Sequence, residues 1–288
     1  MRRCLSRRSG QRGVALLLVL WACTLLAILL GGYAALARTE GLQARYDFAQ
    51  TQAHYAAEAG VMRAVYGLQD PQAKQRWIGD GRTYTFHYGD ATVLLSSVDE
   101  GGKVDLNTAS PEVLQALFQA AGMPQAQAQI LAGRVVDWRN PVNLVGAADS
   151  GREAYAAAGR DYGPRNAPFA SVEELQMVLG MTPALYRQLA GVITIWSGST
   201  SPDPDMAPPL ALAAIPGMTT QQREAIEAAR IKHANDPSLI LNNGTTHSIR
   251  SEATLADGTR AVLRVTVRLQ SGQAQSYAVL RWREGTAE

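Results

Sequence analysis

Cysteine is nearly absent from this sequence of 288 residues, which contains only Cys4 and Cys23. Both stand before residue 38, so the rest of the chain has no thiol from which to form a disulfide. The chain is 47% hydrophobic, which is enough to build a substantial core. We therefore expect the body of the protein to be held by that core, alone or with help from a bound ion.

The local motifs of common enzyme sites are also missing. No GxSxG elbow and no GxxxxGK[ST] loop occurs in the chain. The four histidines have neither HExxH nor paired spacing, which favours structural or surface roles over zinc binding; they are His54, His87, His233 and His247. We expect a protein that is not an enzyme, with no catalytic residues and no small-molecule substrate.

Positive charge does not predominate outside the first residues. The formal net charge is +2, but residues 1–13 hold five arginines and no acid, at Arg2, Arg3, Arg7, Arg8 and Arg12. Without these five charges the formal balance is −3, so the body is mildly acidic. This argues against a dominant surface for nucleic acid.

No charged residue occurs between Val14 and Ala37. As a helix this run would be roughly 36 Å long, enough to cross a hydrocarbon core of roughly 30 Å. The preceding arginines predict a cytoplasmic N-terminus and an exported C-terminal part. Ala34–Ala37 offers a weak cleavage site for an ordinary signal peptide, but the run is long and its helical pattern continues.

Small and apolar residues extend this helical pattern to about Leu68. They recur at steps of three or four, as one stripe of a helix does, at Leu42, Tyr46, Ala49, Ala53, Ala56, Gly60, Ala64 and Leu68. We expect one helix of about 55 residues that starts in a membrane and ends outside it.

Alternating residues predict strands on both sides of the chain's middle third. One β-segment covers residues 82–98, and two more flank a turn at Asp257-Gly258, over residues 249–255 and 261–269. Residues 276–282 supply another strand. One face of this antiparallel sheet is apolar, and the amphipathic half of the long helix can cover it.

The insertion between these strands, residues 99–237, has a helical pattern that repeats. Ser110 is a predicted N-cap with Pro111 at the first helical position, and Ser171 is a second predicted N-cap. Helix-hairpin-helix units are predicted around three turns, 122–124, 180–182 and 217–219. Residues 197–209 read as a flexible or extended linker.

Helix-hairpin-helix units raise a rival hypothesis, a membrane-anchored DNA-binding protein of the DNA-uptake type. Hairpins that bind DNA use a Gly-hydrophobic-Gly turn, whose bare N–H groups reach a phosphate. Here the second glycine is replaced by Pro124, Thr182 and Thr219. Residues 99–187 also hold seven basic and ten acidic side chains, so we expect no nucleic-acid partner. A monomeric membrane-anchored scaffold is a further alternative.

The leader, its final Gly13 and the apolar run that follows resemble the class III signal of type IV pilins and type II secretion pseudopilins. The resemblance implies that prepilin peptidase cuts between Gly13 and Val14 and methylates the new N-terminus. Most members carry glutamate at the fifth mature position, where this chain has Leu18. Such a carboxylate costs about 2.5–3.5 kcal/mol in the bilayer and is kept only if it finds a partner.

The missing glutamate, the segment DEGGKVDLNTAS and the segment NAPFASVEEL together resemble the minor pseudopilin K family of type II secretion. The resemblance implies a subunit at the pseudopilus tip that supports export of folded proteins across the outer membrane. The implied partners are minor pseudopilins I and J, the major pseudopilin, the inner-membrane assembly platform and prepilin peptidase.

The implied fold class is α+β: a long N-terminal transmembrane and amphipathic helix packed on a small antiparallel sheet, with a large inserted all-α helix-hairpin-helix domain. The expected divisions are a leader at 1–13, a membrane part at 14–37, helix and first strands at 38–98, the insert at 99–237 and the last strands at 238–288. The expected location is the inner membrane of a Gram-negative bacterium, crossed once, with the C-terminal domain in the periplasm.

Calcium is the one candidate cofactor, because some members of the resembled family bind it in the helical domain near a tryptophan-containing segment. Here that segment reads Trp138-Arg139-Asn140-Pro141-Val142-Asn143, with amides and an arginine where carboxylates would make a strong oxygen cage. Nearby acids are Asp137, Asp149, Glu153 and Asp161. We assign no metal ligands.

Overall fold

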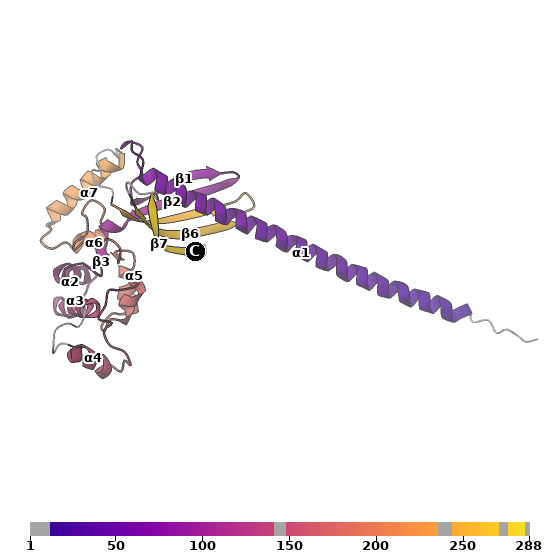
Figure 1. Cartoon of the computed structure of the whole chain (residues 1–288), viewed down its shortest axis with the longest axis horizontal. Coiled ribbons are helices and arrows are strands. Elements are labelled where there is room, and N and C mark those ends of the chain that lie inside the picture. The colour runs from indigo at the N-terminus through magenta and orange to yellow at the C-terminus, as the bar shows by residue number, and fades with distance from the viewer. Residues whose placement is uncertain (1–11, 141–147, 236–243, 271–275, 286–288) are drawn as a thin grey trace, which may run out of the picture.

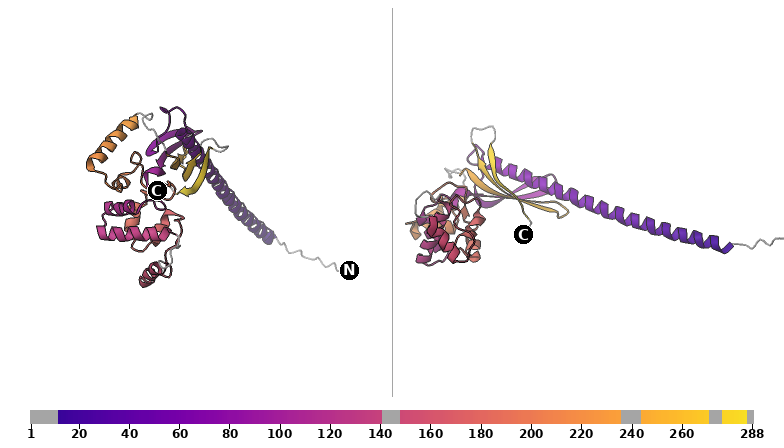
Figure 2. Two further views of the ribbon diagram at one scale, coloured as in Figure 1. Left: turned by 60° about the vertical axis from the view of Figure 1, so that its left-hand side comes forward. Right: turned by 60° about the horizontal axis from the view of Figure 1, so that its bottom comes forward.

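The computed structural model of the chain is elongated, because one helix runs far beyond the domain to which it is attached (Figure 1). The structure describes residues 12–140, 148–235, 244–270 and 276–285. Helix α1, Arg12–Leu68, spans 57 residues. Its C-terminal part lies along a sheet, and its N-terminal part projects away from the rest of the molecule in every view (Figures 1 and 2). The prediction of one long helix ending at Leu68 is confirmed.

Five strands form the sheet, in the order β1-β2-β5-β6-β7. They are β1 Asp80–Tyr88, β2 Ala91–Asp99, β5 Thr246–Thr254, β6 Arg260–Leu269 and β7 Tyr277–Gly285. All neighbours are antiparallel. The predicted segment 82–98 is therefore two strands, which meet at a turn where Gly89 adopts a φ of 56°. The predicted hairpin turn at Asp257-Gly258 is confirmed, with Gly258 at a φ of 88°.

Small side chains let α1 approach the sheet closely. Ala53, Ala57 and Gly60 belong to the buried face of the helix or touch the sheet directly, and a Cβ at Gly60 would lie 2.4 Å from the Oγ of Ser251. The Ser251 hydroxyl donates to the carbonyl of Ala57 at 2.8 Å. The predicted stripe is thus a packing surface from Ala49 onward, and its first members, Leu42 and Tyr46, are exposed.

The insert leaves and rejoins the sheet at one point, since Asp99 at the end of β2 pairs with His247 near the start of β5. Its elements are η1 Glu100–Gly102, β3 Val104–Asp105, α2 Pro111–Ala120, α3 Gln125–Arg139, α4 Ala148–Ala157, η2 Val172–Met177, α5 Pro183–Leu189, β4 Ile193–Thr194, α6 Pro209–Ala213 and α7 Thr220–Asn235. A separate core fills it, with Phe118, Leu117 and Trp138 among the buried side chains. The two cores make the sheet and the insert distinct packing units.

The first predicted hairpin, α2 and α3, is confirmed in detail. Ser110 caps α2, because its hydroxyl accepts from the N–H of Val113 at 3.3 Å, and Pro111 stands in the first turn. In the second hairpin, Ser171 occupies the predicted N-cap position, but the helix that follows is 3₁₀ and the Ser171 side chain makes no capping hydrogen bond. Glu174 instead turns back and accepts from the N–H of Ala170 at 2.8 Å.

Residues 197–209 were predicted to be a flexible or extended linker; the segment has no helix or strand before Pro209, but its hydrogen bonds contradict the flexible alternative. This segment is tied to the start of the insert, because the N–H of Asp203 donates to the carbonyl of Gly101 at 2.9 Å. The hydroxyl of Thr108 donates to the carbonyl of Ser199 at 2.7 Å. Ala207 is fully buried. Serine and proline in this segment therefore make specific turns on a folded surface.

Candidate assembly interface

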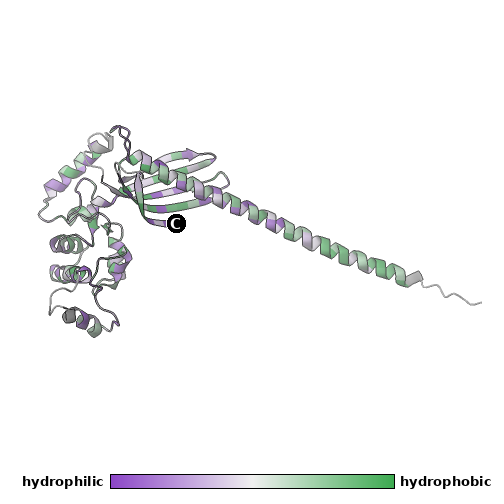
Figure 3. Ribbon diagram, viewed as in Figure 1, coloured by the Kyte–Doolittle hydropathy of each residue, from purple (hydrophilic) through white to green (hydrophobic). Residues whose placement is uncertain are grey.

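The N-terminal half of α1 is an exposed apolar cylinder (Figure 3). It is long and apolar enough to cross a membrane, and none of the residues in its apolar segment is buried inside the molecule. Val14 and Leu18 are 64% and 61% exposed. A surface this large and apolar fits membrane anchoring or a partner of the same kind.

The predicted processing residues lie at the beginning of this cylinder. Gly13 and Val14 are in the first turn of α1, and Leu18 lies one turn beyond Val14 on nearly the same face. Residues 1–11, which include the predicted leader's other arginines, lie outside the described residues. Cleavage after Gly13 and the role of Leu18 remain predictions.

A second apolar strip follows the outer side of α1 beyond the membrane-length segment. We call it the outer stripe, and its members are 72%, 60%, 42% and 65% exposed: Phe48, Tyr55, Met62 and Tyr66. Spacings of seven, seven and four keep them on one helix face. At about 100° per residue, Tyr55 lies about 200° from Ala53, so most of the outer stripe faces away from the sheet. Met62 reaches the edge of the sheet, where its sulfur accepts from the Tyr277 hydroxyl at 3.2 Å.

The outer stripe was not predicted, although its heptad spacing is present in the sequence. The small residues on the opposite face give a stronger periodic signal, and that face was predicted instead. Only the packing of the sheet shows which of the two faces remains open to a partner.

Buried polar groups join the insert to the sheet, at a place that we call the junction. Asp99 accepts two backbone N–H groups at 2.8 Å each, from Gly101 at the insert's start and from Gly244, two residues before β5. His247 is fully buried, and its Nε2 lies 2.8 Å from the carbonyl of Gly244. Burial lowers the pKa of His247, and the negative charge of Asp99 opposes this shift. These contacts set where the insert stands relative to the sheet.

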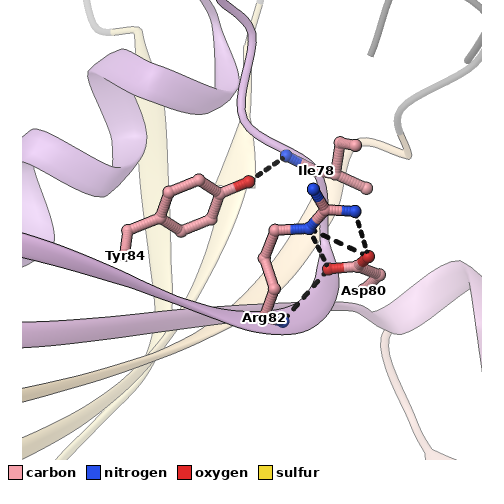
Figure 4. Close-up of polar contacts among 4 residues, drawn as sticks. All are labelled: Ile78, Asp80, Arg82 and Tyr84. Carbon is pink, nitrogen blue, oxygen red and sulfur yellow. Dashed lines mark hydrogen bonds and ion pairs between the residues drawn. The ribbon is translucent and has the colours of Figure 1, made fainter. Parts of the chain in front are cut away.

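The passage from α1 into the sheet is held by a compact polar cluster (Figure 4). The guanidinium and backbone N–H of Arg82 donate to the carboxylate of Asp80 at 2.7–3.1 Å, and the Tyr84 hydroxyl accepts from the N–H of Ile78 at 2.9 Å. Burial alone would raise the pKa of Asp80, but the contacts with Arg82 lower it below its usual value. The Tyr84 ring also stacks on Trp77 at 4.0 Å between centroids.

The tryptophan segment of the insert serves packing and capping. Trp138 is buried and donates its indole N–H to Glu174 at 2.9 Å. Arg139 donates to the carbonyls of Leu106 and Ala109 at 2.7 Å each. Residues 141–147 and the side chain of Asp149 lie outside the described residues. Within the described part, no group of three or more histidine, cysteine or acidic side chains could hold a metal ion, and burial raises the pKa of Asp137.

The histidines have separate surroundings. His54 lies 3.4 Å from Glu58 on α1, His87 is in β1, and His247 is the buried residue of the junction. The side chain of His233 lies outside the described residues. The described histidines therefore form no common site.

The hairpin turns combine a left-handed glycine with a helix cap. Gly122, Gly180 and Gly217 have φ values of 93°, 97° and 75°. In the second glycine's position, the Thr182 hydroxyl accepts from the N–H of Leu185 at 3.2 Å, and Thr219 accepts from Gln222 in the same way. A threonine cap thus occupies an N–H group that a phosphate-binding turn would offer.

The long helix on an antiparallel sheet, with a helical domain inserted between β2 and β5, defines the pseudopilin fold class. Residues 94–198 match the family model described as type II secretion system (T2SS), protein K. This region begins in β2 and ends after β4, so it includes the first two hairpins.

Two relatives extend the match along the chain. The type II secretion system protein K of Klebsiella pneumoniae is 29% identical over 204 residues, which is 62% of this chain and 61% of that protein. A chain in the crystal structure of the GspK-GspI-GspJ complex from the enterotoxigenic Escherichia coli type 2 secretion system has a TM-score of 0.59 at 15% identity, over 85% of this chain and all of that one. The chain thus spans about three fifths of the Klebsiella pneumoniae protein's length, and its residues 94–198 are similar to type II secretion system protein K.

Proposed function

We propose that this protein is the minor pseudopilin at the tip of a type II secretion pseudopilus, where it supports export of folded proteins across the outer membrane. Its α1 helix anchors the newly made chain in the inner membrane, with the N-terminus cytoplasmic and the domain periplasmic. The same helix later packs against the helices of minor pseudopilins I and J.

The observation that carries this proposal is the outer stripe. A helix that already buries its alanine face on its own sheet still exposes Phe48, Tyr55 and Tyr66 on the opposite face. Heptad spacing is what a neighbouring helix needs for side-by-side packing. The related Escherichia coli structure is a complex of K with I and J, which supports helices of those two subunits as the partners.

The absence of a carboxylate at Leu18 supports the tip position. In the resembled filaments that carboxylate pairs with the N-terminus of a preceding subunit, and a tip subunit has none. The proposal therefore expects Leu18→Glu to impair assembly, since an unpaired carboxylate in the bilayer costs about 2.5–3.5 kcal/mol. Improved or unchanged incorporation of Leu18→Glu would argue for an interior position.

Processing is tested at the N-terminus of the protein isolated from membranes. With prepilin peptidase present, the mature chain is expected to begin at a methylated Val14, and Gly13→Asp should block cleavage. An N-terminus beginning just after Ala37 would instead identify an ordinary signal peptide and contradict the proposal.

Assembly is tested by co-expressing the full chain with I, J and the peptidase and capturing a tagged I subunit from detergent. The proposal expects K to be recovered with I and J, and Tyr55→Ser to reduce its recovery by about tenfold or more. Tyr88→Ser is the matched control, because Tyr88 is 53% exposed but lies on β1. Equal loss in both variants would count against the outer stripe, and salt-sensitive binding to duplex DNA without any I or J complex would favour the DNA-uptake alternative.

A further inference from the structure

A groove lies between the insert and the face of the sheet opposite α1. Its volume is about 420 Å³, within the range of ligand-binding clefts. Ser96, Val98 and Val265 are among its sheet residues, and Tyr186 and Trp196 line it from the insert. Neither the apolar half of α1 nor the outer stripe lies on this face.

The strand register gathers arginines along the sheet side of the groove. Arg250 on β5 stands opposite Arg264 on β6, and Arg264 stands opposite Arg283 on β7. Arg281 is two residues from Arg283 on the same strand. We call these four side chains the arginine row. Like charges directly opposite one another destabilise a sheet, so anions close to the arginine row would stabilise it.

The insert already supplies one such anion. Glu173 accepts from Arg281 at 2.6 Å and from Arg283 at 3.1 Å. Burial opposes ionisation of Glu173, yet its own backbone N–H and the two arginines lower its pKa to about 2. The arginine row therefore already binds one side-chain carboxylate, that of Glu173, within this chain.

One carboxylate does not satisfy the row. Arg250 pairs with Glu252 at 2.8 Å. Arg264, the middle member, is exposed and has no acidic partner among the described residues. Lys103 adds a further cation to the lining, although Glu100 neutralises it at 2.5 Å. Arg264 thus lines the groove as an exposed guanidinium that lies against Gly285 of β7 and pairs with no carboxylate of the described residues.

We propose that the arginine row binds an acidic peptide segment of a partner protein, laid in extended form across the strands. The row spans two inter-strand spacings, about 10 Å, and alternate side chains of an extended peptide stand about 6.7 Å apart. Two acidic side chains of such a peptide reach Arg264 and its neighbours, where guanidinium and carboxylate form paired hydrogen bonds. Aromatic and aliphatic lining accepts the residues between them.

A peptide fits this groove better than a phosphate polymer does. The groove is recessed between two packing units, and the chain beyond the leader has a formal charge of −3, so a long anionic polymer would meet repulsion outside the row. The inference concerns the face opposite α1 and does not depend on the proposed tip position.

The test measures fluorescence anisotropy of a labelled peptide with glutamate at alternate positions, mixed with the full chain in detergent. The matched peptide has glutamine at the same positions. Arg264→Gln is expected to weaken binding of the glutamate peptide by about tenfold or more, because it removes a charge-assisted contact. Arg260→Gln is the control on the same strand and face, since Arg260 does not line the groove, and it should change binding less than twofold.

A second variant is expected to act in the opposite direction. Glu173→Gln removes the carboxylate that competes for Arg281 and Arg283, so the glutamate peptide should bind severalfold more tightly. Glu153→Gln, an equal charge change at an exposed residue of α4, should have little effect. Arg264→Gln relieves like-charge contacts and should leave the thermal midpoint unchanged or raised.

Several results would overturn the inference. Equal binding of the glutamine peptide, or equal losses in Arg264→Gln and Arg260→Gln, would show that the row selects no carboxylate. Weaker binding by Glu173→Gln would contradict the competition. Duplex DNA that binds more tightly than the glutamate peptide, through Arg264, would assign the row to phosphate.

Discussion

Replacing Gly60 by alanine tests how closely α1 must approach its sheet. Alanine would ordinarily stabilise a helix interior by about 1 kcal/mol relative to glycine. Here the new Cβ would lie 2.4 Å from the Ser251 Oγ and 2.8 Å from side-chain carbons of Leu95 and Val93. Such distances require the sheet or the helix to shift.

The magnitude follows from three contributions. Overpacking a filled core costs about 1–3 kcal/mol. Displacing the Ser251 hydroxyl endangers its hydrogen bond to Ala57, worth about 0.5–1.5 kcal/mol. Subtracting the helix-propensity gain of about 1 kcal/mol, we expect Gly60→Ala to destabilise the helix–sheet unit by about 1–3 kcal/mol.

Urea unfolding of the full chain in detergent, with hydrogen exchange of the α1 and β5 amides, measures this change. Gly41→Ala and Gly133→Ala are matched controls in helix interiors where a Cβ meets no atom within 4 Å. Both should be neutral or stabilising. Combining Gly60→Ala with Ser251→Ala removes the closest contact, so the double variant should lose less stability than the two single losses added together.

Stabilisation by Gly60→Ala equal to that of the controls would refute the reasoning, because it would mean that the helix has room to spare at this point. Strict additivity of Gly60→Ala and Ser251→Ala would also refute it, since the two sites would then not share the contact.

Other predictions address the junction and the insert. Because burial lowers the pKa of His247, the folded state binds the imidazole proton less readily than the unfolded state does. The contribution of His247 to stability should therefore be full above about pH 6.5 and fall as the pH drops below it. Unfolding midpoints measured from pH 8 to 5 should show this decrease, and His247→Gln should flatten it. Glu174→Ala leaves the Trp138 indole N–H without its acceptor and should cost about 1–3 kcal/mol in urea unfolding; an unchanged midpoint would show that another acceptor takes its place. Leu117→Ala should cost about 2–5 kcal/mol and speed exchange first at amides of the insert, whose core is separate from that of the sheet; equal acceleration in both units would mean that they unfold together.

Much of the architecture could be predicted because it rests on local patterns. The uncharged run from Val14, the alternation in β5 and β6, and the Ser110-Pro111 helix start depend on residues within one or two turns of each other. The 3₁₀ conformation after Ser171 could not be predicted, since Glu174 is drawn instead to Trp138 and Arg165 across the insert. The turns of residues 197–209 were missed for a similar reason, because their partners lie about ninety residues away.

The candidate interface was likewise predictable only in part from the sequence. Local periodicity alone specified α1, its apolar N-terminal half and its small-residue face, because a helix repeats every 3.6 residues whatever it packs against. The exposure of Tyr55, the burial of His247 beside Asp99 and the alignment of Arg250, Arg264 and Arg283 depend on tertiary structure. The pairing of Asp99 with His247 joins strands that lie almost 150 residues apart in the chain. The arginine alignment depends on the register of three consecutive strands, and a shift of one residue would turn every side chain to the opposite face of the sheet.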